Sequence, residues 1–266
     1  MKLNEKNYFS PENQLKYMGS SQFKAFMACE AAALANITGE YREPESDSLL
    51  IGSYVDSYYS GTLDLFKAET PQIFTQKGEL KAQYKHADEI IRRAERDSLF
   101  SQYMSGEKQV IFTGKIAGVP YKIKVDSYHP DKCIVDLKCV RDFNSIWNEE
   151  KRIRQNFIDY WGYTYQAAIY QEIVRQNTGQ ILPFYIAAIT KEKEPNINIF
   201  WIPDEILADK LETVKQLSPR FEKIKRGKLK PQKCEHCNYC RFSKSLTGPK
   251  NYAELAAEEI SDSYGV

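Results

Sequence analysis

The sequence lacks the features that mark secreted, membrane-spanning and repetitive proteins. No N-terminal segment combines a basic stretch, an apolar run and a small-residue cleavage site. No apolar run approaches the ~18 residues that a membrane span requires. Internal repeats and low-complexity blocks are also missing. We therefore expect a soluble, cytoplasmic protein with no membrane partner.

The sequence also has almost no net charge. Its 37 Lys and Arg residues nearly balance 36 Asp and Glu residues, for a formal net charge of +1. A nucleic-acid partner must therefore be argued from local clusters rather than from total charge. With 266 residues, 42% of them hydrophobic, the chain can bury a substantial core. We expect an N-terminal extension over residues 1–20, a main domain over 21–247 and a C-terminal tail over 248–266.

Hydrophobic periodicity predicts three helices in the first part of the chain. The first begins at Ser20 or Ser21, the second has Gly52 and Asp56 on one face, and the third covers residues 82–103.

The later part alternates between strand and helix patterns. Residues 108–140 show the alternation of a three-stranded antiparallel meander, and 157–177 show helical spacing. Two further strands are expected at 181–189 and 196–202, followed by a helix over 204–217. The pattern predicts an α/β fold with a central mixed sheet flanked by helices.

The most informative segment is YKIKVDSYHPDKCIVDLKC, residues 121–139. If residues 130–132 form a hairpin loop, Asp126 falls opposite Asp136, and Val125 falls opposite Leu137. Alternation then places Asp126, Asp136 and Lys138 on one face of the sheet. The other, core-facing side would contain Ile123, Val125, Cys133, Val135, Leu137 and Cys139.

Two opposed carboxylates repel each other unless a positive charge lies between them, because their Cβ atoms are only about 4.5–5.5 Å apart. Hard Mg²⁺, or Mn²⁺, prefers oxygen ligands of this kind and activates bound water. Lys138 could position or deprotonate that water. In the alternative interpretation, the hairpin is merely amphipathic, and Lys124 and Lys138 offset the two aspartates on a solvated face.

Beyond the hairpin, the sequence resembles the PD-(D/E)xK nuclease superfamily, in particular its RecB-type and RecE-like exonuclease VIII branch. Residues 20–29, SSQFKAFMAC, resemble the family's S-x-x-x-F-x-x-C helix, and Gly52 to Asp56 resembles G-x-x-x-H. Aspartate therefore stands where the family usually has a histidine metal ligand. Glu107 resembles the glutamate that opens a strand in the family.

The remaining motifs follow in the family's order. Val125-Asp126 and Asp136-Leu137-Lys138 match the Asp and D-x-K pair, and Gln166 to Tyr170 matches Q-x-x-x-Y. The resemblance implies a restriction-endonuclease-like core and catalytic roles for Asp126, Asp136, Lys138, Gln166 and Tyr170. It also implies metal ligation by Asp56, Asp126, Asp136 and Leu137.

The same resemblance implies a Mg²⁺-dependent or Mn²⁺-dependent DNA nuclease. The expected activity is that of an exonuclease acting on duplex ends in phage-type recombination, with DNA and a single-strand annealing recombinase as partners. A CRISPR-adaptation-type iron–sulfur nuclease is one alternative. A catalytically degenerate DNA-binding module is another, suggested by Asp56 in the histidine position.

Three cysteines near the C-terminus, Cys234, Cys237 and Cys240, have C-x-x-C-x-x-C spacing. Three thiolates are one ligand short of a Cys₄ metal site. Cys29 could supply the fourth ligand, as could His236 in a zinc site. Several nucleases of the resembling branch hold a [4Fe-4S] cluster with one early and three late cysteines, so the resemblance implies that cluster. Zn²⁺ is the main alternative, and burial of the four thiols without a metal is another.

A dense basic stretch lies just before these cysteines. It could follow a phosphate backbone or form a solvated face that balances the acidic tail. Its members are Arg220, Lys223, Lys225, Arg226, Lys228, Lys230 and Lys233.

Overall fold

The computed structural model describes residues 3–149, 151–246, 248–249 and 251–253. Most of the predicted tail, residues 248–266, lies outside the described residues. The centre of the fold is a mixed sheet flanked by helices, as predicted, and its five strands have the order β1-β2-β3-β6-β7. β3 pairs parallel with β6, and the other neighbours pair antiparallel. The strands are β1 (Glu107–Ile116), β2 (Val119–His129), β3 (Cys133–Val140), β6 (Phe184–Thr190) and β7 (Ile197–Ile202).

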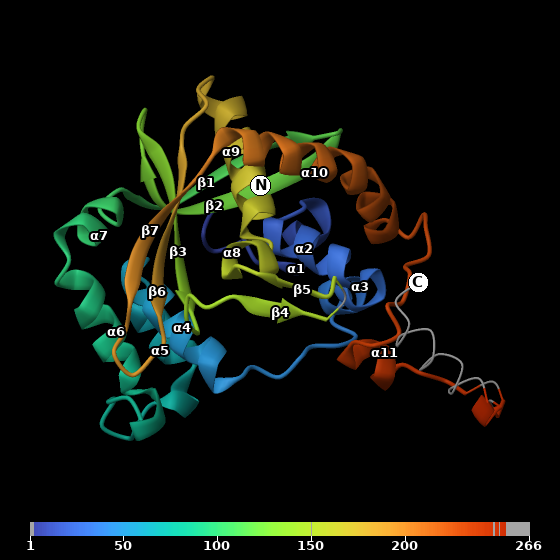
Figure 1. Ribbon diagram of the computed structural model, residues 1–266, viewed down its shortest axis with the longest axis horizontal. Helices are drawn as coiled ribbons and strands as arrows, with labels where there is room; N and C mark the ends of the chain where they lie inside the picture. Colours follow the sequence, from blue (N-terminus) through green and yellow to red (C-terminus); the bar gives the residue numbers. More distant parts are fainter. Residues whose placement is uncertain (1–2, 150, 247, 250, 254–266) are drawn as a thin grey trace.

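Helices cover both faces of this sheet (Figure 1). One face carries α4 (Asp47–Tyr59), α6 (His86–Glu95) and α7 (Ser98–Tyr103). The opposite face carries α2 (Ser20–Ala28), α9 (Tyr163–Thr178) and α10 (Asp204–Lys225). The shorter elements are α1 (Pro11–Lys16), α3 (Glu30–Thr38), α5 (Leu63–Glu69), β4 (Ile146–Asn148), β5 (Ile153–Gln155), α8 (Phe157–Tyr160), α11 (Asn238–Phe242) and 3₁₀ turns at Pro71–Ile73 and Ala82–Tyr84.

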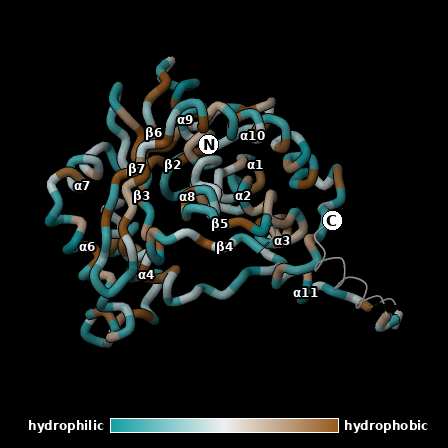
Figure 2. Tube along the Cα trace, in the orientation of Figure 1, coloured by the Kyte–Doolittle hydropathy of each residue, from teal (hydrophilic) through white to brown (hydrophobic). Residues whose placement is uncertain are grey.

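The two layers of helices create two hydrophobic cores separated by the sheet. Along β6, Ile186 and Ala188 pack into the α9 side, whereas Ala187 and Ile189 pack into the α4 side. Alternate strand residues point to opposite faces, so a strand covered on both sides needs a continuous apolar run. Figure 2 shows this run as hydrophobic strands at the centre of a more polar chain. It explains the sequence FYIAAIT of β6.

The prediction of a single core face for the hairpin is wrong. Val125 packs with Ile123 into the α9-side core, whereas Leu137 packs into the α4-side core. Val135, Cys133 and Cys139 also belong to the α4 side. The reason is a local distortion, because the β2–β3 ladder ends at Ser127 and Val135, and the β1–β2 register omits the pair of Gln109 and Asp126. Gln109 itself has a positive φ of 53°.

Four predicted helices are interrupted or differ in length. The first ends at Ala28, Cys29 is extended with φ −163°, and α3 begins at Glu30. Gly162, in the left-handed region at φ 62°, separates α8 from α9. Residues 82–103 form a 3₁₀ turn and two helices rather than one helix. In contrast, α10 continues past the predicted end at 217 to Lys225.

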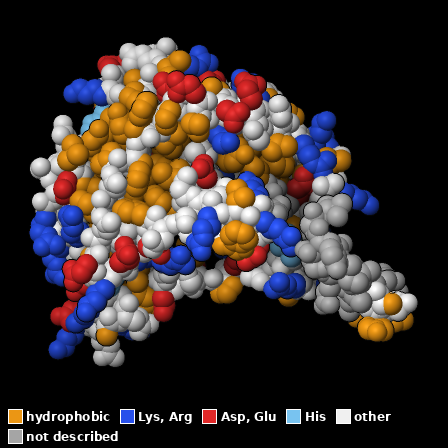
Figure 3. Space-filling view, in the orientation of Figure 1, with side chains coloured by type: hydrophobic (Ala, Val, Ile, Leu, Met, Phe, Trp, Pro, Cys, Tyr) orange, Lys and Arg blue, Asp and Glu red, His pale blue; other side chains and the backbone are white. Residues whose placement is uncertain are grey.

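No helix within the described part of the chain is long and apolar enough to cross a membrane. Hydrophobic side chains do reach the surface over β6 and β7 (Figure 3). Trp201 on the edge strand β7 is among the exposed side chains.

Candidate functional site

The hairpin between β2 and β3 brings the two predicted aspartates to one place. Cys133 pairs with His129, and the loop is closed by a hydrogen bond from Lys132 N to His129 O of 3.0 Å. The same register continues to Ser127 opposite Val135, and one further step reaches Asp126 and Asp136. At that step the strands stop pairing. The predicted three-residue loop is therefore confirmed, and the predicted register holds as far as Ser127 and Val135. The predicted pairs of Asp126 with Asp136 and of Val125 with Leu137 do not form, because the strands diverge at these residues.

Asp126 fills the gap between the diverging strands. Its Oδ2 accepts a hydrogen bond of 2.9 Å from Leu137 N, and its Oδ1 accepts one of 3.2 Å from Gln109 Nε2. Burial raises the pKa of Asp126 well above the ordinary range, and the negative charges of Asp136 and Asp56 raise it further. This environment opposes ionisation unless a cation is present.

Asp136 is buried, with 2% of its surface exposed, and both of its oxygens have partners. Gln166 Nε2 donates to Oδ1 at 2.6 Å, and the Lys138 ammonium forms an ion pair with Oδ2. Lys138 Nζ also donates to Leu137 O at 3.2 Å. Burial alone would lower the pKa of Lys138, but the carboxylates of Asp136 and Asp126 outweigh it and raise that pKa. Lys138 is therefore held in its charged form.

Two predicted site residues reach the hairpin from α9 and take different positions. Gln166 contacts Asp136 directly. Tyr170, one helical turn later, donates its hydroxyl proton to the backbone carbonyl of Lys124 at 3.1 Å. Tyr170 thus contacts the backbone of β2 two residues before Asp126 rather than a carboxylate.

Asp56 approaches from α4, on the other face of the sheet, and keeps access to solvent. Loss of hydration beside β3 raises the pKa of the Asp56 carboxyl, and Lys138 and Lys124 oppose this effect. Leu49, Gly52, Ser53, Asp56, Leu137, Cys139 and Lys191 line a pocket of about 260 Å³ between α4 and β3. Asp56 therefore shares a pocket with side chains of β3, the strand that also carries Asp136.

Glu107 lies apart from these groups. It is exposed at the start of β1, where it pairs with Tyr128. The β1 side chain that reaches the carboxylates is Gln109, which the sequence did not single out.

Two more residues beside the site were missed from sequence. Lys24 of α2 lies with its Nζ 4.8 Å from the centre of the Tyr163 ring, and Lys138 Nζ lies 5.1 Å from the same ring. Lys24 falls between the two phenylalanines of the N-terminal motif, and Tyr163 begins α9. Their periodic positions resemble those of ordinary helix residues, so only the packing of α2 against α9 brings them to the site.

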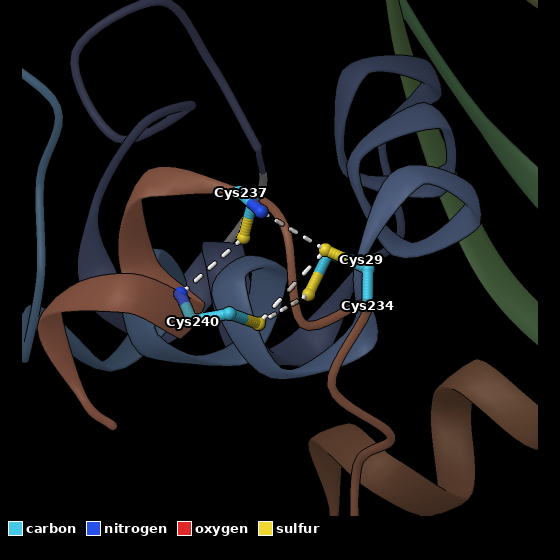
Figure 4. Close-up of side chains that lie close together, drawn as sticks. All are labelled: Cys29, Cys234, Cys237 and Cys240. Atoms are coloured by element: carbon cyan, nitrogen blue, oxygen red, sulfur yellow. Dashed lines mark hydrogen bonds between the residues drawn. The ribbon is translucent and has the colours of Figure 1, made fainter. Parts of the chain in front are cut away.

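The four cysteines of the predicted metal site lie together at a second place in the fold. The Sγ atoms of Cys29, Cys234, Cys237 and Cys240 all lie within 4.8 Å of one another. Figure 4 shows these side chains converging. The Sγ atoms of Cys29 and Cys240 are 3.6 Å apart, and those of Cys234 and Cys240 are 3.9 Å apart. The prediction that Cys29 lies beside the late cysteines is confirmed. His236 is exposed and is not in this group.

Backbone N–H groups are arranged around the sulfur atoms as donors. Cys237 N donates to Cys234 Sγ, and Cys240 N donates to Cys237 Sγ, each at 3.4 Å. Burial would raise the pKa of Cys234, but N–H groups of His236 and Cys237 outweigh it and lower that pKa. Burial instead raises the pKa of Cys237 to about 12 and also raises the pKa of Cys240, so a bound cation is needed to favour all four thiolates, the form that binds metals. The four residues therefore fit a sulfur-bound metal centre, which we call the cysteine cluster.

The contacts beside the cysteine cluster account for part of the predicted basic stretch. Arg220 forms a two-pronged ion pair with Glu30, at 2.6 and 2.9 Å, and Gln232 N donates to the same carboxylate. Lys225 donates to the Tyr17 carbonyl and to the amide oxygen of Gln22. Arg220 and Lys225 therefore make structural contacts, because α10 continues through the first half of the stretch. The remaining members are exposed, so the phosphate-binding and solvated-face interpretations of the stretch both stay predictions: Lys223, Arg226, Lys228, Lys230 and Lys233.

Comparison with known proteins agrees with this architecture. The family described as "PDDEXK-like domain of unknown function", DUF3799, matches residues 19–243. The crystal structure of a protein from Eubacterium rectale, titled "Putative exonuclease", is 45% identical and superimposes with a TM-score of 0.90. That alignment covers 97% of this chain and 99% of the other.

A crystal structure of SSO0001 aligns over 80% of this chain and 89% of the other, at 14% identity and a TM-score of 0.27. That score is too low to support an argument. The search of curated proteins found no match. The family match covers most of the chain and the E. rectale alignment nearly all of it, so this protein belongs to the DUF3799 family of PDDEXK-like domains.

Proposed function

We propose that this protein hydrolyses phosphodiester bonds of DNA at a site formed by Asp126, Asp136 and Lys138. One observation carries the proposal. Two carboxylates meet where β2 and β3 diverge, and a buried lysine is paired with one of them. The raised pKa of Asp126 marks a site that favours a bound cation, and perturbed groups of this kind are typical of functional sites.

The donor set fits a hard divalent cation. Asp126 and Asp136 would supply carboxylate oxygens, and the Leu137 carbonyl already accepts a hydrogen bond from Lys138 beside them. Among the described residues only the four cysteines form a group of three or more His, Cys, Asp or Glu ligands within reach of one another. Asp56, which interacts electrostatically with Asp136, would therefore have to move closer to become a third ligand. Bound Mg²⁺ or Mn²⁺ would supply an activated water and stabilise charge on the phosphoryl oxygens.

The protein's own residues prepare the site for that cation. Gln166 orients Asp136 through its 2.6 Å hydrogen bond, and Tyr170 fixes β2 near Asp126. Lys138, released from Asp136 when a cation binds, would direct its ammonium toward the phosphate and stabilise developing negative charge.

The arrangement supports an enzyme over a binding module with a degenerate site. The degenerate-site alternative depends on the aspartate at position 56, where the family usually has histidine. However, Asp56 lies within electrostatic range of Lys138 and Asp136, and an oxygen ligand suits Mg²⁺ better than nitrogen does. The aspartate is therefore compatible with catalysis.

We further propose that DNA ends are the substrate, in phage-type recombination with a single-strand annealing partner. The exonuclease title of the E. rectale protein supports the first part. The annealing partner rests on the resemblance to RecE-like nucleases alone.

For the cysteine cluster, we propose a structural Zn²⁺ ion. Four thiolates around one tetrahedral zinc, with Zn–S bonds of about 2.3 Å, lie about 3.8 Å apart. The separations of 3.6 and 3.9 Å support that geometry. A [4Fe-4S] cluster binds each thiolate to a different iron and needs a wider arrangement. Metal analysis of anaerobically purified protein tests the choice: stoichiometric zinc without colour supports it, and a brown protein containing iron and sulfide contradicts it.

End-labelled linear DNA and covalently closed circular DNA test the main proposal. With Mg²⁺ or Mn²⁺, the linear substrate should release labelled mononucleotides or short products, whereas the circle should persist. EDTA should stop the reaction. Failure of purified, folded protein to degrade linear DNA with either cation contradicts the proposal, and cutting of the circle contradicts its exonucleolytic part.

A further inference from the structure

Lys24 is a second lysine at the candidate active site, contributed by a different element from Lys138. Its Nζ donates to the Trp161 carbonyl at 3.3 Å and lies over the Tyr163 ring. Lys138 lies over the same ring, so the two ammonium groups share one aromatic neighbour. The side chain thus extends from α2 to the start of α9, beside the group that contacts Asp136.

Among the described residues Lys24 has no paired carboxylate of its own, and the Asp136 carboxylate acts on it only from beyond ion-pair distance. Lys138 has an ion pair with Asp136, whereas Lys24 has none within the part of the chain that the structure describes. Burial and, to a smaller extent, the charge of Lys138 lower the pKa of Lys24 to about 8, an effect that Asp136 opposes. A partly buried ammonium without an anionic partner costs stability. An anion that enters the site would remove that cost.

Lys24 also has unused hydrogen-bonding capacity. An ammonium group has three donors, and the Trp161 carbonyl occupies one of them. The Tyr163 ring attracts the positive charge but accepts only through its π face. At least one N–H is therefore available to an oxygen atom from a ligand.

We propose that Lys24 binds a phosphate of the DNA backbone next to the bond that is hydrolysed, and so positions the substrate over the carboxylates. The inference rests on the proposed function and adds a substrate-binding residue to it. Phosphate is the anion that a nucleic acid brings, and lysine binds it as a compact point charge. In this role Lys24 transfers no proton.

The competing explanation is structural, because Lys24 could simply hold α2 against α9. Lys210 offers a matched control. It also lies over a tyrosine of α9, with Nζ 5.6 Å from the centre of the Tyr165 ring, but it pairs with Asp209. A purely structural cation–π contact predicts similar effects for loss of either lysine.

The experiment compares Lys24→Ala, Lys24→Arg and Lys210→Ala with the wild type in the full-length protein. Steady-state hydrolysis of end-labelled duplex DNA with Mg²⁺ gives kcat and KM, and thermal unfolding reports the fold of each variant. Binding of fluorescent DNA is then measured at several salt concentrations, with Ca²⁺ replacing Mg²⁺ and with Asp136→Asn combined with each lysine variant.

We expect Lys24→Ala to lower kcat/KM by about 10–100-fold, which is the loss of one charge-assisted hydrogen bond. The slope of log binding constant against log salt should become shallower by about 0.9, because one phosphate contact is lost. Lys24→Arg should recover most of the salt slope, and Lys210→Ala should leave both quantities near wild type.

Active wild type together with an unchanged kcat/KM and salt slope in folded Lys24→Ala overturns the inference and leaves the proposed function standing. Equal losses in Lys24→Ala and Lys210→Ala, accompanied by lower unfolding temperatures, also overturn it in favour of the structural role. Inactive wild type overturns the proposed function, and this inference with it. If Lys24→Ala does not fold, the salt slope and kcat/KM of Lys24→Gln decide in the same way.

Discussion

The carboxylate–lysine site and the cysteine cluster both collect polar ligands inside one domain, but they do so in opposite ways. The first uses oxygen atoms at a place where two strands diverge, and Asp56 beside it keeps contact with solvent. The second uses four sulfur atoms, one from Cys29 and three from residues 234–240, that lie within 4.8 Å of one another. An open oxygen site leaves positions for water and substrate, whereas a closed sulfur site leaves none. We therefore propose that the first region performs chemistry and that the second stabilises the fold.

The helix α2 connects the two regions. It carries Lys24 beside the carboxylates and ends at Ala28, so that Cys29 follows directly and enters the cysteine cluster. The cysteine cluster therefore fixes one end of the helix that presents Lys24. Loss of the cluster should loosen both chain ends while the hairpin keeps its own register.

The largest expected effect is the loss of DNA hydrolysis when a residue of the carboxylate–lysine site is replaced. Asp136→Asn and Lys138→Ala should each lower DNA hydrolysis by a factor of about 10³ or more, because each removes charge that stabilises the transition state. Circular dichroism should show an intact fold. Glu107→Gln, an exposed acid two residues from Gln109, is the control and should keep wild-type activity. Substantial activity in either folded site variant contradicts the mechanism.

The next effect concerns stability. Cys29→Ser should release the metal and lower the free energy of unfolding by about 3–5 kcal/mol, the range for opening a long cross-linked loop. Cys133→Ser, which changes a half-buried thiol outside the cysteine cluster, should cost less and keep the metal. Urea denaturation with metal analysis makes the comparison. An unchanged metal content in Cys29→Ser would show that Cys29 is no ligand.

A smaller effect is expected for the residue that orients Asp136. Gln166→Ala should reduce kcat by about 10–100-fold, since it removes a hydrogen bond to a charged group without removing the charge. KM for DNA should change little. A loss confined to KM would instead place Gln166 in substrate binding.

The smallest effect is a pH dependence of stability in the metal-free protein. The raised pKa of Asp126 means that its contribution to stability is complete below about pH 4, the ordinary Asp value. That contribution is lost as the pH rises through the raised pKa of the folded state. In EDTA, the unfolding temperature of wild type should therefore fall with rising pH more steeply than that of Asp126→Asn. Added Mg²⁺ should reduce the difference, and parallel curves in EDTA would contradict the assigned environment.

The features predicted from sequence were those set by local spacing or by chemical type. The hairpin loop and the register beside it could be predicted from strand alternation on either side of three loop residues. The position of Cys29 could be predicted because the three late cysteines lack a fourth metal ligand. The orientation of Val125 and Leu137 toward opposite faces of the sheet was not predicted, because it depends on the break in strand pairing at Gln109 and Asp126. A single residue with positive φ cannot be recognised from alternation when it is not glycine.

Residues that depend on packing between distant elements were also missed. Lys24 reaches the site only because α2 lies against α9, and Lys225 is buried only because α10 continues beyond Leu217. A basic side chain gives the same sequence pattern whether it faces solvent, a carbonyl or a substrate. The distinction appears only when the partner atoms are placed.

Anomalous diffraction from crystals soaked in Mn²⁺ tests the central claim most directly, because it locates metals in both regions at once. Data collected at the manganese, iron and zinc absorption edges should show manganese between the carboxylates of Asp126 and Asp136. A different metal should lie among the four cysteines, without manganese. Manganese absent from the carboxylates, or no metal among the cysteines, would contradict the division into a catalytic oxygen site and a structural sulfur site.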